Sequence, residues 1–246
     1  MTIPLPRVIT VDGPAGSGKS SVSFAIAADL GYLFVDTGAF YRAITLAALR
    51  AGLENADEQP LENLARHSRL DILPATGERQ YTVLLNGEDV TEVIRESRVE
   101  ASVSRVAALQ AVRSVLNEKY RELATRGGVI MAGRDIGTIV LPDADLKIYL
   151  DASPEARAAR RYKQRAANNQ PANYDEILAT MRARDAYDSG RTVDPLRRAN
   201  DAYYLHTDHL SVEQVIEHLE QVIRTWKKSP VDVPSENPGL SSQPGR

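Results

Sequence analysis

Residues 7–30, RVITVDGPAGSGKSSVSFAIAADL, decide the fold, because an apolar run meets a glycine-rich octet and then a helix-like segment. The octet at 13–20 fits the pattern G-x-x-x-x-G-K-[S/T], whose glycines let successive backbone N–H groups point inward around an anion. The helix that begins at about Gly18 adds the positive end of its dipole. The stretch therefore predicts a phosphate-binding loop between the first strand and the first helix.

Two residues of this loop are not required by a plain strand-to-helix turn. Lys19 is expected to place a mobile positive charge on β- and γ-phosphates, and the Ser20 hydroxyl is expected to ligate Mg²⁺. Their presence favours a loop that binds a nucleoside triphosphate over a turn without a ligand.

Outward from the loop, strand-like and helix-like segments alternate. Apolar runs at 32–35, 129–132, 146–150 and 202–206 predict four more strands, and the helical spacing between them is typical of a parallel sheet covered by helices. Apolar residues at 99–123 predict one long amphipathic helix. Alternation from about 66 to 93, with Asn86-Gly87 as a turn, predicts a small antiparallel insert.

We therefore expect an α/β protein with a five-stranded parallel sheet, organised as one domain over 1–228. Residues 229–246 are rich in Pro, Ser and Gly, and we predict a disordered tail there. The expected parts of the domain are a core at 1–65, 94–152 and 189–228, the insert at about 66–93, and a lid at about 153–188.

Composition excludes several classes of protein. The 246 residues carry a formal net charge of -3, so no overall basic field favours nucleic acid or a membrane surface. The chain has no cysteine, which excludes disulfides and cysteine-based zinc sites. Neither a signal-like start nor an apolar run of transmembrane length is present, so we expect a soluble cytoplasmic protein.

Charged residues follow the predicted strands. Asp12, Asp36 and Asp151 each end an apolar run, and Gly133-Arg134-Asp135 ends another. In an open parallel sheet the carboxyl ends of the strands line the ligand crevice, which places these residues beside the phosphate loop. An aspartate after a strand also serves to cap the next helix, and for Asp151 that interpretation is favoured. Ser153-Pro154 has the pattern of an N-cap and a first helical residue for the helix that follows.

Arginines from four separate segments are candidates for binding phosphate, because the planar guanidinium suits a phosphoryl group better than an ammonium does. The run between 157 and 165 alone would fit a solvated helix face, but its position after a strand of this fold favours a lid. The candidates are Arg42, Arg134, Arg157, Arg160, Arg161, Arg184 and Arg191.

With these motifs, the chain over about 7–228 resembles the bacterial cytidylate (CMP/dCMP) kinases of the nucleoside monophosphate kinase family. Residues 36–42, DTGAFYR, are similar to the family segment D-[S/T]-G-A-x-Y-R, and 133–138, GRDIGT, to G-R-D-[I/M]-G-T. Residues 13–21 resemble the family's ATP loop, which often has Gly-Thr where this chain has Ser20-Ser21.

The resemblance implies transfer of a phosphoryl group from ATP, with Mg²⁺, to CMP or dCMP by a monomer that has no nucleic-acid or membrane partner. It assigns the cytosine ring to Ser104, Arg113 and Asp135, the ribose to Arg184 and Asp188, and the acceptor phosphate to Arg42, Arg134 and Arg191. It also implies ATP binding by Gly13, Pro14, Ala15, Gly16, Ser17, Gly18, Lys19, Ser20 and Ser21, acceptor binding by Thr37, metal binding by Ser20, and catalysis by Lys19, Arg134, Arg157 and Arg161.

Other functions stay open at this point. The nearest alternative is the same chemistry on UMP, AMP or a small metabolite hydroxyl. A GTPase-like switch would require a D-x-x-G segment and an [N/T]-K-x-D motif, and the sequence contains neither. A nucleotide-binding adaptor without catalysis has no support, because Lys19 and the arginines are all present.

Overall fold

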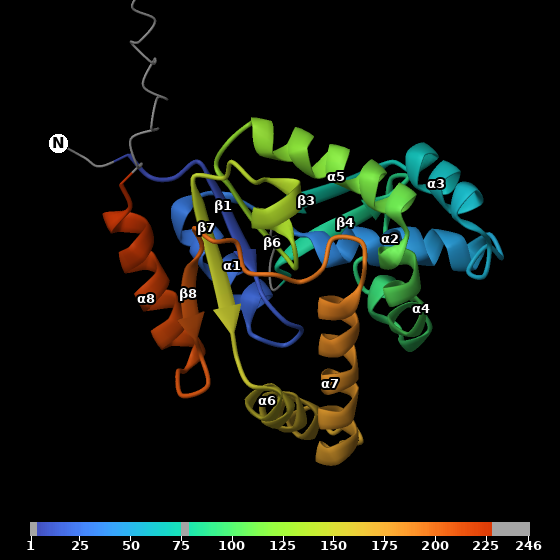
Figure 1. Cartoon of the computed structure of the whole chain (residues 1–246). Helices are drawn as coiled ribbons and strands as arrows, with labels where there is room; N and C mark the ends of the chain where they lie inside the picture. The colour runs from blue at the N-terminus through green and yellow to red at the C-terminus, as the bar shows by residue number, and fades with distance from the viewer. Residues whose placement is uncertain (1–3, 75–78, 228–246) are drawn as a thin grey trace, which may run out of the picture.

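Valine and isoleucine dominate the central strands, as is typical of strands covered on both faces. The computed structural model describes residues 4–74 and 79–227, and its main sheet has five parallel strands in the order β2-β6-β1-β7-β8 (Figure 1). All five predicted strands are confirmed. They are β1 (Val8–Asp12), β2 (Leu33–Asp36), β6 (Val129–Gly133), β7 (Leu146–Asp151) and β8 (Tyr203–His206).

The register of the sheet determines where the functional loops lie. Asp12, the last residue of β1, is paired with Gly133 of β6 and with Tyr149 of β7. The carboxyl ends of the three central strands therefore share one edge, and the loops that follow β1 and β6 begin side by side.

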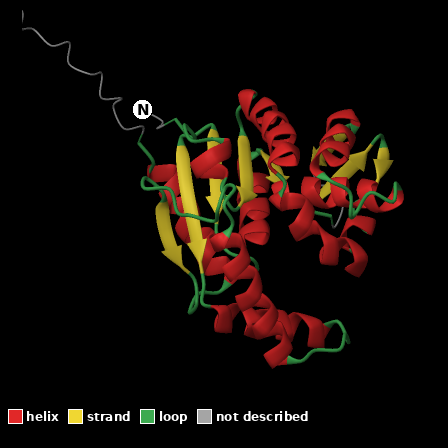
Figure 2. Cartoon of the chain, turned by 45° about the vertical axis from the view of Figure 1, so that its right-hand side comes forward, coloured by secondary structure: helices red, strands yellow, loops and turns green. Residues whose placement is uncertain are grey.

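Helices surround the main sheet, while α6 and α7 extend beyond its carboxyl edge and form the lower part of the molecule (Figure 1, Figure 2). α1 packs against β2, β6 and α8. The helices are α1 (Lys19–Leu30), α2 (Thr37–Arg50), α3 (Glu58–His67), α4 (Ser97–Ala108), α5 (Gln110–Thr125), α6 (Pro154–Ala167), α7 (Tyr174–Gly190) and α8 (Val212–Thr225), with short turns η1 (Val93–Arg95) and η2 (Ile136–Val140).

Side-chain caps fix the ends of several helices. Ser153 caps α6 by accepting a hydrogen bond from the Ala156 amide, and Ser211 forms a capping box with Gln214 at the start of α8. Asp151 was expected to cap α6, but it instead accepts hydrogen bonds from the Ala152 amide and the Tyr204 hydroxyl. That expectation was wrong because the chain continues extended for two more residues before α6 begins.

The single long helix predicted over 99–123 is also wrong, because the chain breaks at Leu109 into α4 and α5. Leu109 is extended, with φ −75° and ψ 121°. Apolar residues at Val106 and Val112 are six positions apart, which would put them about 120° apart around one continuous helix. Two separate helices allow both valines to be fully buried.

The antiparallel insert is confirmed as a three-stranded sheet of β3 (Leu70–Pro74), β4 (Tyr81–Leu85) and β5 (Glu88–Asp89). Asn86 and Gly87 both have positive φ, 53° and 87°, as the tight hairpin turn requires. Residues 75–78, between β3 and β4, and the predicted tail at 229–246 lie outside the described residues.

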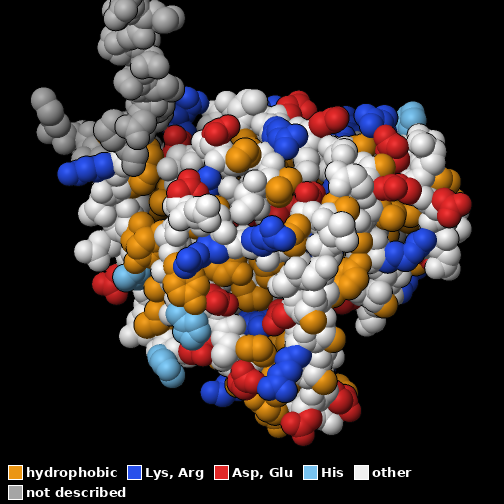
Figure 3. Space-filling model, in the orientation of Figure 1, with side chains coloured by type: hydrophobic (Ala, Val, Ile, Leu, Met, Phe, Trp, Pro, Cys, Tyr) orange, Lys and Arg blue, Asp and Glu red, His pale blue; other side chains and the backbone are white. Residues whose placement is uncertain are grey.

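Basic and acidic side chains are interspersed over the visible face of the molecule (Figure 3). Of the helices that the structure describes, none combines the length and the apolar character needed to cross a membrane.

Candidate active site

The glycine-rich loop turns tightly out of β1. Gly13 has φ 147°, and a Cβ at this position would overlap the carbonyl oxygen of Leu150 on the neighbouring strand. Gly18, with φ 93°, starts α1 in the left-handed region that glycine adopts at little cost. The helix N-terminus therefore points its amide groups into the loop, as an anion site requires.

Lys19 lies in the first turn of α1 and folds back over the loop. Its Nζ donates a hydrogen bond of 2.7 Å to the carbonyl oxygen of Pro14, and its side chain is buried. Burial, and then the nearby positive charge of Arg134, lower the pKa of Lys19 below its ordinary value. Arg134, in the turn after β6, is therefore close enough to Lys19 for its charge to act on the phosphate loop.

Side-chain oxygen atoms that could bind a metal ion lie together beside the loop, at the end of β2. The Ser20 hydroxyl donates to a carboxylate oxygen of Asp36 at 3.2 Å, and the Tyr81 hydroxyl donates to the same oxygen at 3.2 Å. Hydroxyl and carboxylate oxygens are ligands that Mg²⁺ accepts, and Mg²⁺ is usually held by one or two such groups together with substrate phosphates and water. The residues at this point therefore fit a magnesium ion.

Arg157 joins the phosphate loop to both helices of the lower part. Its Nε donates to the carbonyl oxygen of Ala152 and its Nη1 to that of Ala15, both at 2.9 Å, and the guanidinium also pairs with Asp185 of α7. The side chain is only 2% exposed. Arg161, one turn later on α6, instead faces solvent and donates to Gln164 at 3.3 Å.

A buried cluster of charged residues forms where α5, the turn after β6 and the loop after α7 meet. Arg113 donates to Asp135 through Nη2, and to Asp194 through Nε at 2.6 Å. Arg191 lies 3.6 Å from the other oxygen of Asp135. Burial raises the pKa of Asp135, although the two guanidinium groups oppose this effect.

The turn that carries Asp135 is anchored from β1. Both carboxylate oxygens of Asp12 accept backbone hydrogen bonds, from Ile136 at 2.9 Å and from Gly137 at 2.7 Å. Burial raises the pKa of Asp12 to about 6 in spite of these two bonds. Asp12 therefore fixes the backbone immediately after Asp135.

The remaining candidate arginines pair with carboxylates across the same crevice. Arg134 donates to Asp188 of α7 at 2.9 Å. Arg42 of α2 and Arg184 of α7 both donate to Glu100 of α4, each with a shortest distance of 2.8 Å. Burial raises the pKa of Glu100, but the two guanidinium groups outweigh burial and leave this pKa below its ordinary value.

Two smaller candidates lie beside these pairs. The Thr37 hydroxyl donates to the carbonyl oxygen of Ala132 at 2.9 Å, next to Gly133. Ser104 is on α4, one turn after Glu100, and its carbonyl oxygen accepts a hydrogen bond of 3.3 Å from the Tyr187 hydroxyl. The structure thus brings the candidates together at the carboxyl ends of the strands, with the exceptions of Arg161 and of Arg160, whose guanidinium donates to Thr207 after β8.

Sequence reasoning missed the acidic partners of the arginines. Glu100, Asp185 and Asp194 pair with Arg42, Arg157 and Arg113, respectively, over separations of 58, 28 and 81 residues. Asp12 was placed at the correct edge of the sheet, but its anchoring role was not foreseen. The residues next to a carboxylate in the sequence do not indicate which distant arginine it will pair with. Only the excess of arginines at the site could have suggested that acidic partners were needed.

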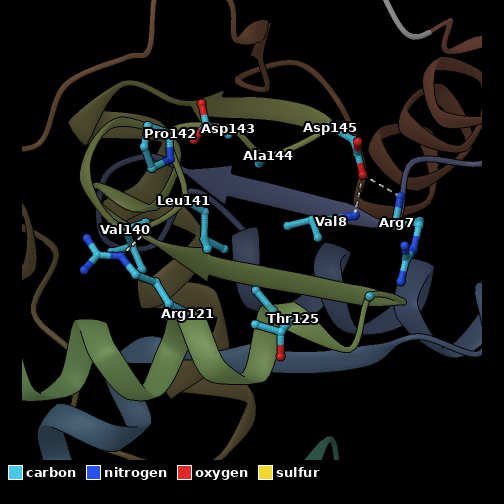
Figure 4. Close-up of a pocket in the computed structure, with 12 residues that line it drawn as sticks. Arg7, Val8, Arg121, Thr125, Val140, Leu141, Pro142, Asp143, Ala144 and Asp145 are labelled. Atoms are coloured by element: carbon cyan, nitrogen blue, oxygen red, sulfur yellow. Dashed lines mark hydrogen bonds between the residues drawn. The ribbon is translucent and has the colours of Figure 1, made fainter.

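A separate cleft of about 510 Å³ lies at the opposite end of the sheet, where β1 and β7 begin (Figure 4). Asp145 accepts hydrogen bonds from the backbone amides of Arg7 and Val8, and Arg121 donates to the carbonyl oxygen of Val140. The length of β1 separates this cleft from the glycine-rich loop, so the cleft is not part of the phosphate site.

Known proteins resemble this chain over most of its length. The family model described as cytidylate kinase matches residues 9–225. A cytidylate kinase from Exiguobacterium sp. is 43% identical over 219 residues, covering 89% of this chain and 97% of that protein. Those from Bacillus pumilus and Pasteurella multocida are 47% and 46% identical, covering 84% and 85% of this chain and 91% of each relative. The chain therefore belongs to the cytidylate kinase family.

Proposed function

We propose that the protein transfers the γ-phosphoryl group of ATP to CMP and dCMP, producing ADP together with CDP or dCDP. The observation that carries this proposal is the buried pair of Arg113 and Asp135 at the same sheet edge as the phosphate loop. A phosphate loop alone fits many kinases, whereas this pair offers a specific set of hydrogen-bonding groups for a base.

In this proposal the base is read by complementary polar groups. The Asp135 carboxylate accepts a hydrogen bond from the exocyclic amine of cytosine, which uracil lacks. Arg113, held between Asp135 and Asp194, offers donors to the acceptor groups of the ring. Ser104 completes the base contacts, and Arg184 with Asp188 holds the ribose. UMP and AMP remain the alternative acceptors.

Catalysis then consists of alignment and charge neutralisation, without a covalent intermediate. Arg42, Arg134 and Arg191 hold the acceptor phosphate, and Lys19 neutralises charge that develops on the transferred group. Ser20 and Asp36 would hold Mg²⁺, which neutralises charge on the β- and γ-phosphates when it is bound. The backbone amides of 13–21 orient the donor triphosphate for in-line transfer.

The helices α6 and α7 are proposed to act as the lid, within the limits 153–188 expected from the sequence. Arg157 already contacts the phosphate loop through Ala15, so it is the lid arginine best placed to meet the donor. Arg161 contributes only after movement of α6. Closure would exclude water and so suppress wasteful hydrolysis of ATP.

We also propose that the protein works as a cytoplasmic monomer in pyrimidine nucleotide metabolism, without a nucleic-acid or membrane partner. The net charge of -3 and the interspersed charges on the face that Figure 3 shows support the absence of such partners. The substrates are nucleotides, and the charged groups that would bind them lie within the crevice.

The deciding experiment measures ADP formation from ATP and Mg²⁺ with CMP, dCMP, UMP, AMP and GMP supplied one at a time at equal concentration. We expect turnover confined to CMP and dCMP. Turnover with another monophosphate would retain the phosphoryl chemistry and overturn the roles of Arg113 and Asp135. No turnover with any acceptor would favour a non-catalytic nucleotide-binding protein.

A further inference from the structure

One carboxylate bridges two arginines in the crevice between α2, α4 and α7. Glu100 Oε2 accepts hydrogen bonds from Arg42 Nη2 at 2.8 Å and Nε at 3.2 Å, and Glu100 Oε1 accepts one from Arg184 Nη1 at 2.8 Å. Each oxygen of the carboxylate therefore serves a different guanidinium group. A phosphate group bound between two arginines can likewise place a different oxygen on each guanidinium group.

The surroundings of Glu100 are basic and open to solvent. Arg42 Nη1 lies beside the first turn of α2, where a Cβ on Gly38 would meet it at 3.0 Å. Arg42 and Arg184 thus reach Glu100 from two different helices. The Glu100 side chain is 41% exposed, so a ligand can reach it from solvent.

We propose that Glu100 is an internal competitor for Arg42, one of the three arginines assigned to the acceptor's phosphate, and for Arg184, so that an acceptor must displace it in order to bind. The inference rests on the proposed function, because that function assigns Arg42 to the acceptor phosphate and Arg184 to the ribose of the same nucleotide. The Glu100 side chain would thereby compete, within the same molecule, with the acceptor for Arg42.

Every anion that binds Arg42 meets this competition, and a nucleoside monophosphate can overcome it. A phosphate monoester carries a charge of about −1.5 to −2 and three strong acceptor oxygens, compared with one charge and two oxygens for the carboxylate. A nucleotide adds the contacts of its base and sugar, whereas inorganic phosphate adds none. Glu100 therefore raises, by the same factor, the concentration at which each of the two ligands binds, and the additional contacts of CMP keep its binding the stronger.

The test compares the wild type with Glu100→Gln, which retains the size of the side chain and removes its charge. Because two partly exposed ion pairs must break before the acceptor binds, removing the charge of Glu100 should lower the KM for CMP roughly three- to tenfold. The inhibition constant of inorganic phosphate against CMP should fall at least as much, with kcat within about twofold of the wild type.

Two further variants keep the result interpretable. Glu96→Gln, at the start of the same helix, removes a carboxylate that pairs with Arg98 and should leave both constants unchanged. Glu100→Asp keeps the charge but shortens the reach by one methylene, so its constants should lie between those of the wild type and Glu100→Gln. A KM for CMP that is unchanged or higher in Glu100→Gln would overturn the inference, since it would make Glu100 a brace for the arginines.

A binding measurement separates this inference from the proposed function. With ADP in excess to occupy the phosphate loop, thermal unfolding is followed as inorganic phosphate is added. Glu100→Gln should be stabilised at a severalfold lower phosphate concentration than the wild type, whether or not CMP is the acceptor. Equal phosphate dependence would overturn the inference, whereas failure of the wild type to phosphorylate CMP would overturn only the proposed function.

Discussion

At the scale of the residue, the crevice is built from arginines that each meet a carboxylate. Arg113 and Arg157 are both only 2% exposed, and an unpaired guanidinium would be costly to bury there. The carboxylates reduce that cost and also fix the direction of each guanidinium. In the proposed function, a nucleotide contacts some of these carboxylates and takes the place of others at the arginines. Recognition of the substrate then depends on both kinds of contact.

Replacing Asp135 by Asn should erode the preference for cytosine. The change replaces one acceptor oxygen by a donor amide, which no longer complements the exocyclic amine. A hydrogen bond to a charged group is worth about 1.5–3 kcal/mol, so the ratio of kcat/KM for CMP to that for UMP should fall roughly tenfold to a hundredfold. Steady-state assays with both acceptors measure this ratio.

Asp143→Asn is the matched control, because Asp143 lines the cleft at the opposite end of the sheet (Figure 4). The ratio of kcat/KM for CMP to that for UMP in Asp143→Asn should equal the ratio in the wild type. If Asp135→Asn also discriminated as well as the wild type does, the base would have to be read by other residues.

Replacing Lys19 by Ala should lower kcat while leaving CMP binding unchanged. Lys19 lies on the donor side of the site, against the carbonyl oxygen of Pro14. Loss of one preorganised charge that stabilises the transition state typically lowers kcat by a factor on the order of 10²–10³. Steady-state kinetics and a separate CMP binding titration test the two parts, and normal turnover in the variant would contradict the role of the phosphate loop.

At the scale of the element, the turn η2 is held in place by β1. Asp12 accepts two backbone hydrogen bonds from η2, so the position of Asp135 depends on a strand that lies more than one hundred residues earlier. The break at Leu109 matters for α5 in a comparable way, because Arg113 lies in the first turn of α5 and donates to Asp135 from there. The proposed base site therefore depends on strand β1 and on the break that sets the start of α5.

The raised pKa of Asp12 predicts a measurable dependence of stability on pH. Its pKa is about 6 in the folded protein and 3.8 ordinarily, so folding takes up a proton between these values. The stability gained in this way is fully present below pH 3.8 and is lost as the pH rises through 6.

Asp12→Asn removes this titration. Relative to the variant, the free energy of unfolding of the wild type should increase by about 1.4 kcal/mol when the pH is lowered from about 7 to about 5. Urea unfolding of both proteins at the two pH values gives this difference. A difference that did not change with pH would show that the folded-state pKa of Asp12 lies near its ordinary value.

At the scale of the whole molecule, two kinds of contact join the α6–α7 pair. Arg157 is buried and links α6 to both Asp185 of α7 and the phosphate loop. Arg182 of α7 and Glu155 of α6 form a pair in which both partners face solvent, with exposed fractions of 59% and 51%. The buried contact therefore connects the proposed lid to the core, whereas the exposed one only joins the two helices.

This difference predicts unequal effects of two matched alanine substitutions. Asp185→Ala leaves the Arg157 guanidinium buried without its carboxylate and should lower the free energy of unfolding by about 2 kcal/mol. Glu155→Ala should lower it far less, because its partner remains hydrated. The urea midpoints of the two variants measure the two losses of stability. Equal losses would show that the burial of Arg157 does not depend on Asp185.

The sequence by itself determined the strands and the phosphate loop. The phosphate loop, the five parallel strands, the Asn86-Gly87 hairpin and the cap at Ser153 are all encoded in residues close together along the chain. Backbone conformation responds to such local patterns, since glycine permits positive φ and helix termini need a polar cap. The segments at 36–42 and 133–138 likewise led, through the family resemblance, to the prediction that Arg42 and Arg134 hold the acceptor phosphate.

Only the tertiary structure decided which groups neutralise those arginines and where the helices break. Glu100 meets Arg184 over a separation of 84 residues, and Asp12 meets Ile136 over 124. The helix break at Leu109 follows from the need to bury both Val106 and Val112, which depends on the surfaces that the two helices contact. Such contacts depend on the packing of distant segments, and a carboxylate has the same local sequence signature whether it faces water or a buried guanidinium group.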